Sequence, residues 1–197
     1  GAALAAPEGK SLQTAGEETL RRRHLRDSLL DLSRCDSGRL SVGQQPVALL
    51  PLLEQVQELA QSTQQRSIVL LLPDSAELIT NADPDRLQQV LLNLIENACK
   101  YSGPQAPVEL ALLSSPDELR IEVRDQGIGA PSEDQERIFE RFQRATNAPA
   151  GEGSGLGLSV VRLLVEGMGG QVSLRSQLGR GSVFSLHLRP VERADHT

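Results

Sequence analysis

The chain has 197 residues, of which 39% are hydrophobic and 23% charged, and its formal net charge is −6. This length and composition fit one globular domain with a short appendage, and the acidic balance argues against nucleic acid as a partner. No apolar run reaches the roughly 18 residues of a membrane-spanning helix, so we expect no membrane contact from these residues, and two cysteines are too few for a disulfide framework.

Residues 1 to 16 are small and polar and are expected to form a poorly ordered arm. The stretch from Glu17 to Arg39 has helical periodicity, with Leu25, Leu29 and Leu32 spaced by four and three residues. A leucine seam of this kind packs on another helix. Because the stretch has too little apolar surface to fold alone, we expect it to need a partner helix.

The other elements are predicted from periodicity, capping residues and turn residues. Asp83 and Pro84 have the order of a helix cap and a first-turn proline. In chain order we expect a helix from Pro46 to Gln65, strands at Ile68–Leu72 and Glu77–Thr80, a helix over Pro84–Tyr101, strands at Val108–Leu113 and Leu119–Arg124, a short helix from Ser132, a helix after Gly157 that ends near Gly167, and strands at Gln171–Ser176 and Ser182–Leu188. Strands paired by hairpins, with helices between them, indicate an α+β two-layer sandwich preceded by one long helix.

The helix over residues 84–101 has a polar stripe beside its apolar face. At about 100° per residue, Asn93, Asn97 and Lys100 fall on this stripe. Amide oxygens suit a hard cation and an ammonium suits a phosphate. A solvated helix face is the alternative interpretation of the stripe alone.

Two glycine-containing segments follow. Asp125 ends a strand and is followed at once by Gly127 and Gly129, where the backbone could approach a flat ligand, although an ordinary turn fits the same residues. Four alternating glycines between Gly151 and Gly157 then lead into a helix, whose free N–H groups can bind phosphate. The second segment lacks the Gly-Lys-Ser/Thr of the Walker loop.

The order and spacing of these motifs resemble the ATP-binding domain of sensor histidine kinases. Four segments are similar to the asparagine, first glycine, phenylalanine and second glycine boxes of the Bergerat (GHKL) fold: Asn93–Ser102, Asp125–Gly129, Ile138–Phe142 and Gly153–Leu158. The resemblance covers about residues 46–190. Upstream, Leu29–Leu40 is similar to the end of the second helix of a dimerisation and histidine-phosphotransfer hairpin.

The resemblance implies roles for the residues of the first two boxes. Asn97 would coordinate Mg²⁺ that bridges the ATP phosphates, with Asn93 beside it. Lys100 would contact phosphate and Tyr101 would flank the adenine. Asp125 would accept a hydrogen bond from the adenine amino group. Gly127 and Gly129 would leave room for the base.

Residues of the later segments receive implied roles as well. Residues 130–152 would form a mobile lid, which Phe139 and Phe142 anchor and from which Arg144 reaches the γ-phosphate. The nucleotide-binding set is completed by the hinge and phosphate-facing residues Gly153, Ser154, Gly155, Leu156, Gly157 and Leu158. The catalytic set would be Asn93, Lys100 and Arg144.

The resemblance implies a protein-histidine kinase that uses ATP and Mg²⁺. ATPases of this fold have a glutamate where this chain has Asn93, and an amide cannot act as a base, so attack by water should be slow. The implied partners are a helix carrying the acceptor histidine, in the same or a partner subunit, and the receiver domain of a response regulator. The implied location is the cytoplasm. The parent protein would be a homodimer, and the resemblance does not indicate whether it is anchored in a membrane.

The acceptor histidine of the family, followed by Glu or Asp and later by proline, matches none of His24, His187 and His196. We therefore expect a fragment, with residues 1–45 as the remnant of the hairpin, 46–190 as the ATP-binding domain and 191–197 as a tail. Two alternatives are a nucleotide-dependent interaction module without phosphate transfer and another GHKL protein, such as a serine kinase or a chaperone-like ATPase.

Overall fold

The computed structural model describes residues 26–74, 78–149 and 153–191. The chain divides into two compact units, Gly1–Leu40 and Ser41–Thr197. In the first unit residues 26–36 are helical, which is the part of the expected helix that falls within the described residues. The helix ends three residues before the predicted Arg39, because Gly38 takes the left-handed conformation, with φ of +65°. The expected arm lies outside the described residues.

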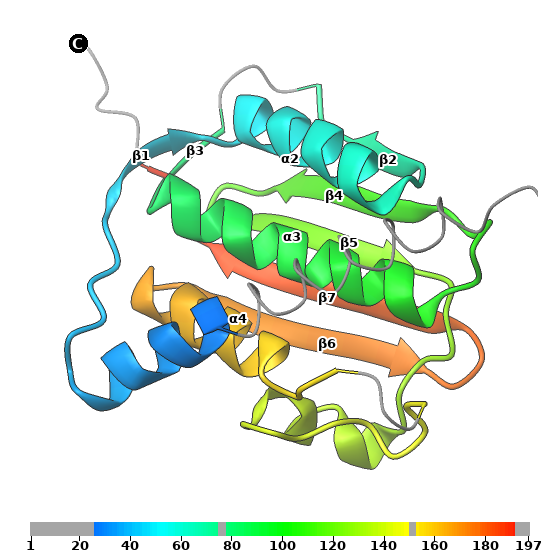
Figure 1. Ribbon diagram of the computed structural model, residues 1–197. Helices are drawn as coiled ribbons and strands as arrows, with labels where there is room; N and C mark the ends of the chain where they lie inside the picture. Colours follow the sequence, from blue (N-terminus) through cyan, green and yellow to red (C-terminus); the bar gives the residue numbers. More distant parts are fainter. Residues whose placement is uncertain (1–25, 75–77, 150–152, 192–197) are drawn as a thin grey trace, which may run out of the picture. The chain divides into compact units, whose positions relative to one another are not determined.

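In the second unit, three described helices cover one face of a five-stranded sheet (Figure 1). The helices are α2 (Leu49–Gln64), α3 (Pro84–Tyr101) and α4 (Gly157–Gly167). The strands lie in the order β2 (Ile68–Leu71), β4 (Val108–Ser114), β5 (Leu119–Asp125), β7 (Gly181–Leu188) and β6 (Gln171–Gln177). The predicted two-layer α+β sandwich is confirmed. Among the described residues, no helix is long and apolar enough to cross a lipid bilayer.

The strand pairing combines predicted hairpins with pairings that local sequence does not indicate. Antiparallel pairs join β4 to β5 and β6 to β7, as the turns between them predict. Strand β2 pairs with β4 in the parallel direction, and β1 (Gln45–Ala48) pairs with β3 (Ile79–Ala82) in a separate two-stranded sheet. Both pairings join strands that a long connection separates.

Strand β5 shows how the sheet sorts its side chains between two faces. Ile121 and Val123 are fully buried towards the helices, and Asp125 continues the same alternation at the end of the strand. Neighbouring side chains in a strand point to opposite faces, so Glu122 and Arg124 lie on the outer face. The alternation therefore places the Asp125 carboxylate in the helical layer.

The start of α3 follows the prediction. The Asp83 side chain accepts a hydrogen bond from the Arg86 N–H at 3.1 Å, and Pro84 is the first helical residue. The second oxygen of Asp83 accepts a hydrogen bond from the Gly43 N–H at 2.9 Å. One carboxylate therefore caps α3 and holds the segment that leads into β1.

Three predicted boundaries are wrong. Pro46 does not open a helix but lies in β1. Because β1 has only one neighbouring strand, it can hold a residue without an N–H. Pro51 lies in the first turn of α2 instead. Strand β3 begins at Ile79 rather than Glu77, which lies outside the described residues. The helix expected from Ser132 is two short 3₁₀ turns, η1 (Ser132–Asp134) and η2 (Arg137–Phe139), because the Ser132 hydroxyl bonds to the Glu133 carboxylate rather than capping an N–H group.

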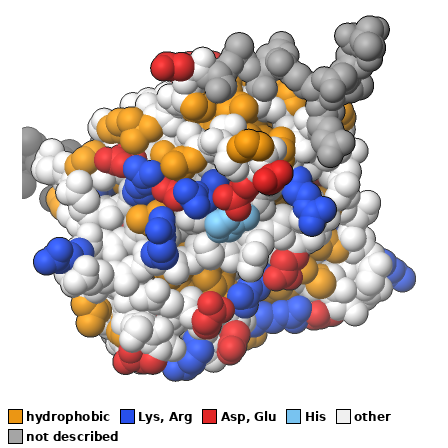
Figure 2. All heavy atoms as spheres, turned by 180° about the vertical axis from the view of Figure 1, so that it is seen from behind, with side chains coloured by type: hydrophobic (Ala, Val, Ile, Leu, Met, Phe, Trp, Pro, Cys, Tyr) orange, Lys and Arg blue, Asp and Glu red, His pale blue; other side chains and the backbone are white. Residues whose placement is uncertain are grey.

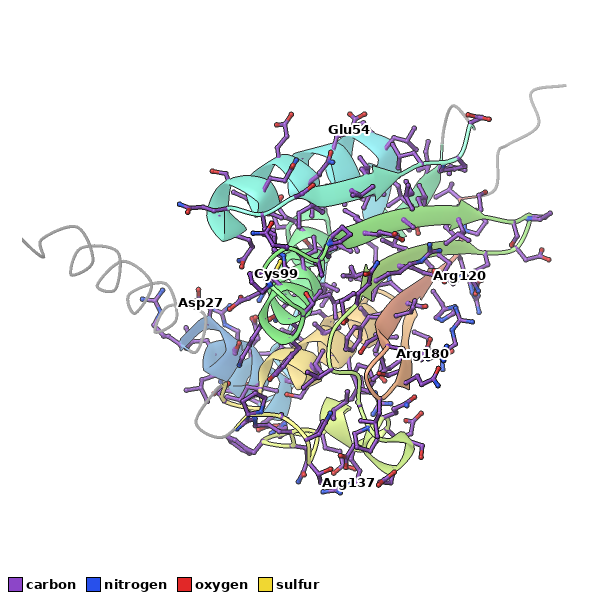
Figure 3. All side chains as sticks on the ribbon, turned by 90° about the vertical axis from the view of Figure 1, so that its right-hand side faces the viewer. Asp27, Glu54, Cys99, Arg120, Arg137 and Arg180 are labelled. Carbon is purple, nitrogen blue, oxygen red and sulfur yellow. The ribbon has the colours of Figure 1, made fainter. Side chains whose placement is uncertain are left out.

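Acidic and basic side chains alternate on the outer face of the sheet (Figure 2). Glu122 is only 2% exposed there, and its oxygens lie 2.8 Å from Arg124, 3.1 Å from Arg120 and 3.5 Å from Arg175. A buried carboxylate needs such partners. Figure 3 views the sheet from the side, with Cys99 of α3 on the helical side and Arg120 on the outer side.

Replacing Asp83 with alanine should lower the free energy of unfolding by about 1–2 kcal/mol, because the α3 cap is lost. The matched control is Asp83→Asn, which keeps a side-chain acceptor and should lose much less. Urea denaturation of both variants measures the effect. Equal midpoints for the wild type and Asp83→Ala would contradict the capping role.

Candidate functional site

The polar stripe of α3 is half-buried beside the apolar face of the helix. Asn93, Asn97 and Lys100 are each partly exposed, as the helical spacing predicts. The apolar face is buried to 1% exposure or less and consists of Leu87, Val90, Leu91, Leu94, Ile95 and Ala98. Because this face fixes the rotation of the helix, the stripe is directed to one side, where the segment before α4 lies.

The second glycine segment lies against this stripe. The Asn93 amide donates a hydrogen bond to the Gly157 carbonyl at 3.4 Å. A Cβ atom on Gly157 would lie 3.0 Å from the Asn93 side-chain oxygen, and one on Gly153 would lie 2.8 Å from the Lys100 ammonium nitrogen. Residues more than 50 positions apart in sequence thus lie in close contact, and glycine keeps these two contacts close.

The hinge residues of this segment have different environments. Gly153 and Gly155 have positive φ angles of +83° and +72°. Ser154 is exposed and its hydroxyl accepts a hydrogen bond from the Leu156 N–H at 3.3 Å. The Leu156 side chain is 1% exposed, so only its backbone could contact a ligand, and Leu158 is half-buried. No described side chain caps α4, which leaves its first N–H groups for an anion.

Asp125 ends β5 with a carboxylate that is 9% exposed. One of its oxygens accepts a hydrogen bond from the Gly127 N–H at 2.7 Å. Burial raises the pKa of the Asp125 carboxyl above its usual range, while the Gly127 and Ser182 N–H groups and the charge of Arg66 oppose the rise. The site therefore holds a buried carboxylate with lone pairs left to accept a further hydrogen bond.

The glycines after Asp125 have a packing role in addition to the one expected. A Cβ atom on Gly127 would overlap the Tyr101 carbonyl oxygen, and one on Gly129 would overlap the Gln177 carbonyl oxygen. Gly127 pairs with Ser102 in an isolated β-bridge, and the Ile128 N–H donates to the Tyr101 carbonyl at 3.1 Å. Gly127 therefore joins the end of α3 to the end of β5, and Gly129 lies against the end of β6.

Tyr101 closes α3 between the two glycine segments. The Lys100 ammonium nitrogen lies 5.0 Å from the centre of the Tyr101 ring. A Cβ atom on Gly153 would lie 4.0 Å from the Tyr101 hydroxyl oxygen. The ring therefore lies near both the stripe and Gly153, and a place for it beside a bound base stays a prediction.

The segment from residue 130 to 149 is held by one buried carboxylate. Asp134 is 0% exposed, and it accepts hydrogen bonds from the Thr146 N–H and hydroxyl, both at 2.7 Å. Phe139 is buried and packs edge-on against Phe184, with ring centroids 6.3 Å apart. The prediction that Phe142 also anchors this segment is wrong, because its side chain is 68% exposed.

Arg144 is engaged inside the same segment. Its guanidinium donates a hydrogen bond to the Pro149 carbonyl. Its buried Nε has no hydrogen-bond partner among the described residues. Contact of Arg144 with a γ-phosphate therefore stays a prediction.

Sequence analysis did not identify two residues that contribute to the site. Arg66 follows α2 and bonds to residues more than 30 positions away, and Asp134 bonds to Thr146 across the following loop. No local motif marks either residue.

With this geometry in view, comparison with known proteins identifies the family. The model of the histidine kinase-, DNA gyrase B-, and HSP90-like ATPases matches residues 82–192, and the chain belongs to this family. It is 33% identical over 183 residues to the circadian input-output histidine kinase CikA of Synechococcus elongatus, covering 90% of this chain and 24% of CikA. It is 35% identical over 171 residues to the signal transduction histidine-protein kinase BarA of Escherichia coli, covering 82% of this chain and 19% of BarA.

Solved structures agree with this placement. The full-length protein ShkA in complex with AMPPNP superposes with a TM-score of 0.73 at 29% identity, covering 96% of this chain and 41% of ShkA. The mycobacterial sensor histidine kinase MprB superposes with a TM-score of 0.67 at 25% identity, covering 74% of this chain and 98% of the MprB chain. The chain spans a quarter or less of the length of CikA and BarA.

The amide proton of Thr146 should report the ionisation of Asp134. Hydrogen bonds from the Thr146 N–H and hydroxyl stabilise the carboxylate and hold the pKa of Asp134 below its usual range. The stability that they contribute is therefore complete above the ordinary aspartate pKa and is lost as pH falls through the lowered one. An NMR titration should give a midpoint for the Thr146 amide below the ordinary aspartate pKa, and a midpoint at or above the ordinary pKa would contradict this role.

Proposed function

We propose that the chain is the ATP-binding catalytic region of a sensor histidine kinase. In this proposal it transfers the γ-phosphate of ATP to a histidine on a dimerisation helix, for relay to an aspartate of a response-regulator receiver domain. CikA and BarA are histidine kinases by name, which supports the choice of acceptor. The parent protein would be a homodimer, and this region would work in the cytoplasm.

One observation carries the proposal: Tyr101 at the end of α3 lies against both Gly127, whose N–H bonds to Asp125, and Gly153 of the segment before α4. The proposed binding surface would have the Asp125 acceptor at one end and, at the other, the Lys100 ammonium and the N–H groups that begin α4. An adenine nucleotide has an amine donor at one end and phosphates at the other. Phosphoryl transfer depends chiefly on positioning and charge neutralisation, which such a surface supplies.

The amides of the stripe fit a magnesium ion. Mg²⁺ takes oxygen ligands and keeps much of its water, so one protein amide together with nucleotide phosphates is a plausible set. Asn97 would supply that amide, because Asn93 already bonds to Gly157. The ion would neutralise charge on the phosphates, and Lys100 would hold them in place.

The residue at position 93 favours transfer to a histidine over hydrolysis. An amide cannot take a proton from water, and the Asn93 amide is also hydrogen-bonded to the hinge. The γ-phosphate would therefore be kept for an imidazole. Glu96, further round α3, would be a solvent-facing carboxylate without a role as a base.

The acceptor imidazole is proposed to lie outside this chain. His187 is held in β7 by hydrogen-bond contacts of 2.8 Å to both Ser173 and Glu118, which supports a structural role. His24 and His196 lie outside the described residues, and neither has the sequence context of the family's acceptor. The acceptor would be on a partner helix that packs on the leucine seam.

Substitution of Asp125 tests the nucleotide site. Asp125→Asn should weaken ADP binding about tenfold or more, because the amide has one acceptor oxygen in place of two and the charge of the acceptor is lost. The matched control is Glu122→Gln, a buried carboxylate on the outer face of the same strand. Equilibrium dialysis with ADP measures both, and equal affinities for Asp125→Asn and the wild type would remove Asp125 from the site.

Substitution of Asn97 tests the metal. Asn97→Asp adds a negative charge next to the phosphates, so ATP affinity should fall without Mg²⁺ and recover as Mg²⁺ is added. The wild type should show a shallower dependence. Titrations of both proteins with ATP at several Mg²⁺ concentrations measure this difference. If the two metal dependences coincide, Asn97 is not the ligand.

A further inference from the structure

Arg66 binds the end of α3 from outside the recognised motifs. It lies between α2 and β2 and is half-buried. Its Nη1 donates to the Cys99 carbonyl at 2.6 Å, its Nη2 lies 2.9 Å from the Ser102 hydroxyl, and its Nε donates to the Ala106 carbonyl at 3.2 Å. The Gly103 carbonyl also accepts from Nη2. Cys99, labelled in Figure 3, marks this end of α3.

One of these acceptors, the Cys99 carbonyl, belongs to the last turn of α3, and the Gly103 and Ala106 carbonyls belong to the loop that follows. The last carbonyls of an α-helix have no N–H groups to bond with and carry partial negative charge. A guanidinium offers five donors in a rigid plane, so a single arginine can satisfy several carbonyls at once. Arg66 therefore fixes both the last turn of α3 and the loop that leads to β4.

Ser102 links the contacts of Arg66 to Asp125. Ser102 is 9% exposed, and its hydroxyl bonds to the Ala98 carbonyl at 2.5 Å as well as to Arg66. Its backbone forms the isolated bridge with Gly127, whose N–H is bonded to Asp125. A continuous chain of hydrogen bonds and paired backbone thus runs from Arg66 to the Asp125 carboxylate.

We propose that Arg66 is a positioning residue for recognition of the adenine base, which sets the place of the Asp125 acceptor through Ser102 and Gly127. This inference rests on the proposed function, because it takes Asp125 as the acceptor of the adenine amine. Arg66 itself does not touch the base. Its effect should therefore appear in the discrimination between bases rather than in the binding of phosphates.

The charge of Arg66 also favours a hydrogen bond from the adenine amine to Asp125. Burial raises the pKa of the Asp125 carboxyl, and the positive charge of Arg66 acts against that rise. Removal of the guanidinium would weaken the ionised form of Asp125 and loosen its backbone support together. Both changes reduce the strength of a hydrogen bond from an adenine amine.

The test compares ADP with IDP, whose base has a carbonyl oxygen where adenine has the amine. The wild type should prefer ADP. Arg66→Ala should lower that preference about tenfold, by weakening ADP binding with little effect on IDP. Arg66→Lys keeps the charge without the planar fork and should restore the preference only in part. Arg175→Ala removes the same charge on the outer face and should leave the preference unchanged.

The outcomes separate this inference from the proposed function. A wild type that binds neither nucleotide overturns the proposed function. A wild type that prefers ADP, with the same preference in Arg66→Ala, overturns the role of Arg66, as does an equal loss of both nucleotides. If Arg66→Ala does not fold, Ser102→Ala breaks the same chain of contacts. An unchanged ADP preference in that variant then overturns the inference.

Discussion

The burial of one face of α3 is the constraint on which the site depends. Six apolar side chains of this face are 1% exposed or less, and each large one contributes about 1.5–3 kcal/mol when buried. Turning the helix by one residue, about 100°, would expose most of them, so the rotation of α3 is fixed. The stripe with Asn93, Asn97 and Lys100 is therefore directed at the segment before α4, where Asn93 bonds to Gly157.

The glycines connect this fixed helix to the rest of the site. Gly157 and Gly153 lie against the stripe, and Gly127 lies against the last carbonyls of α3. A Cβ atom at Gly127 would overlap the Tyr101 carbonyl oxygen, so that contact requires glycine. The same close contacts leave backbone N–H groups near α3, where a phosphate could reach them. Packing and the proposed ligand binding thus place the same demand on these residues.

The sequence predicts those parts of the structure whose causes are local. The cap at Asp83, the extent of α3 and the glycine segments each follow from neighbouring residues. Pro46 misled the prediction, because proline fits an edge strand as well as a helix start. The exposure of Phe142 and the contacts of Arg66 depend on residues far along the chain, and no local pattern specifies them. The parallel pairing of β2 with β4 is also nonlocal.

The most direct measurement is a crystal structure of the chain with AMPPNP and Mg²⁺. The account predicts the adenine amine within hydrogen-bond distance of the Asp125 carboxylate, and the phosphates between the α3 stripe and residues 153–157. It further predicts a metal ion in contact with the Asn97 amide. A nucleotide bound on another surface, or bound here with its base away from Asp125, would contradict the account.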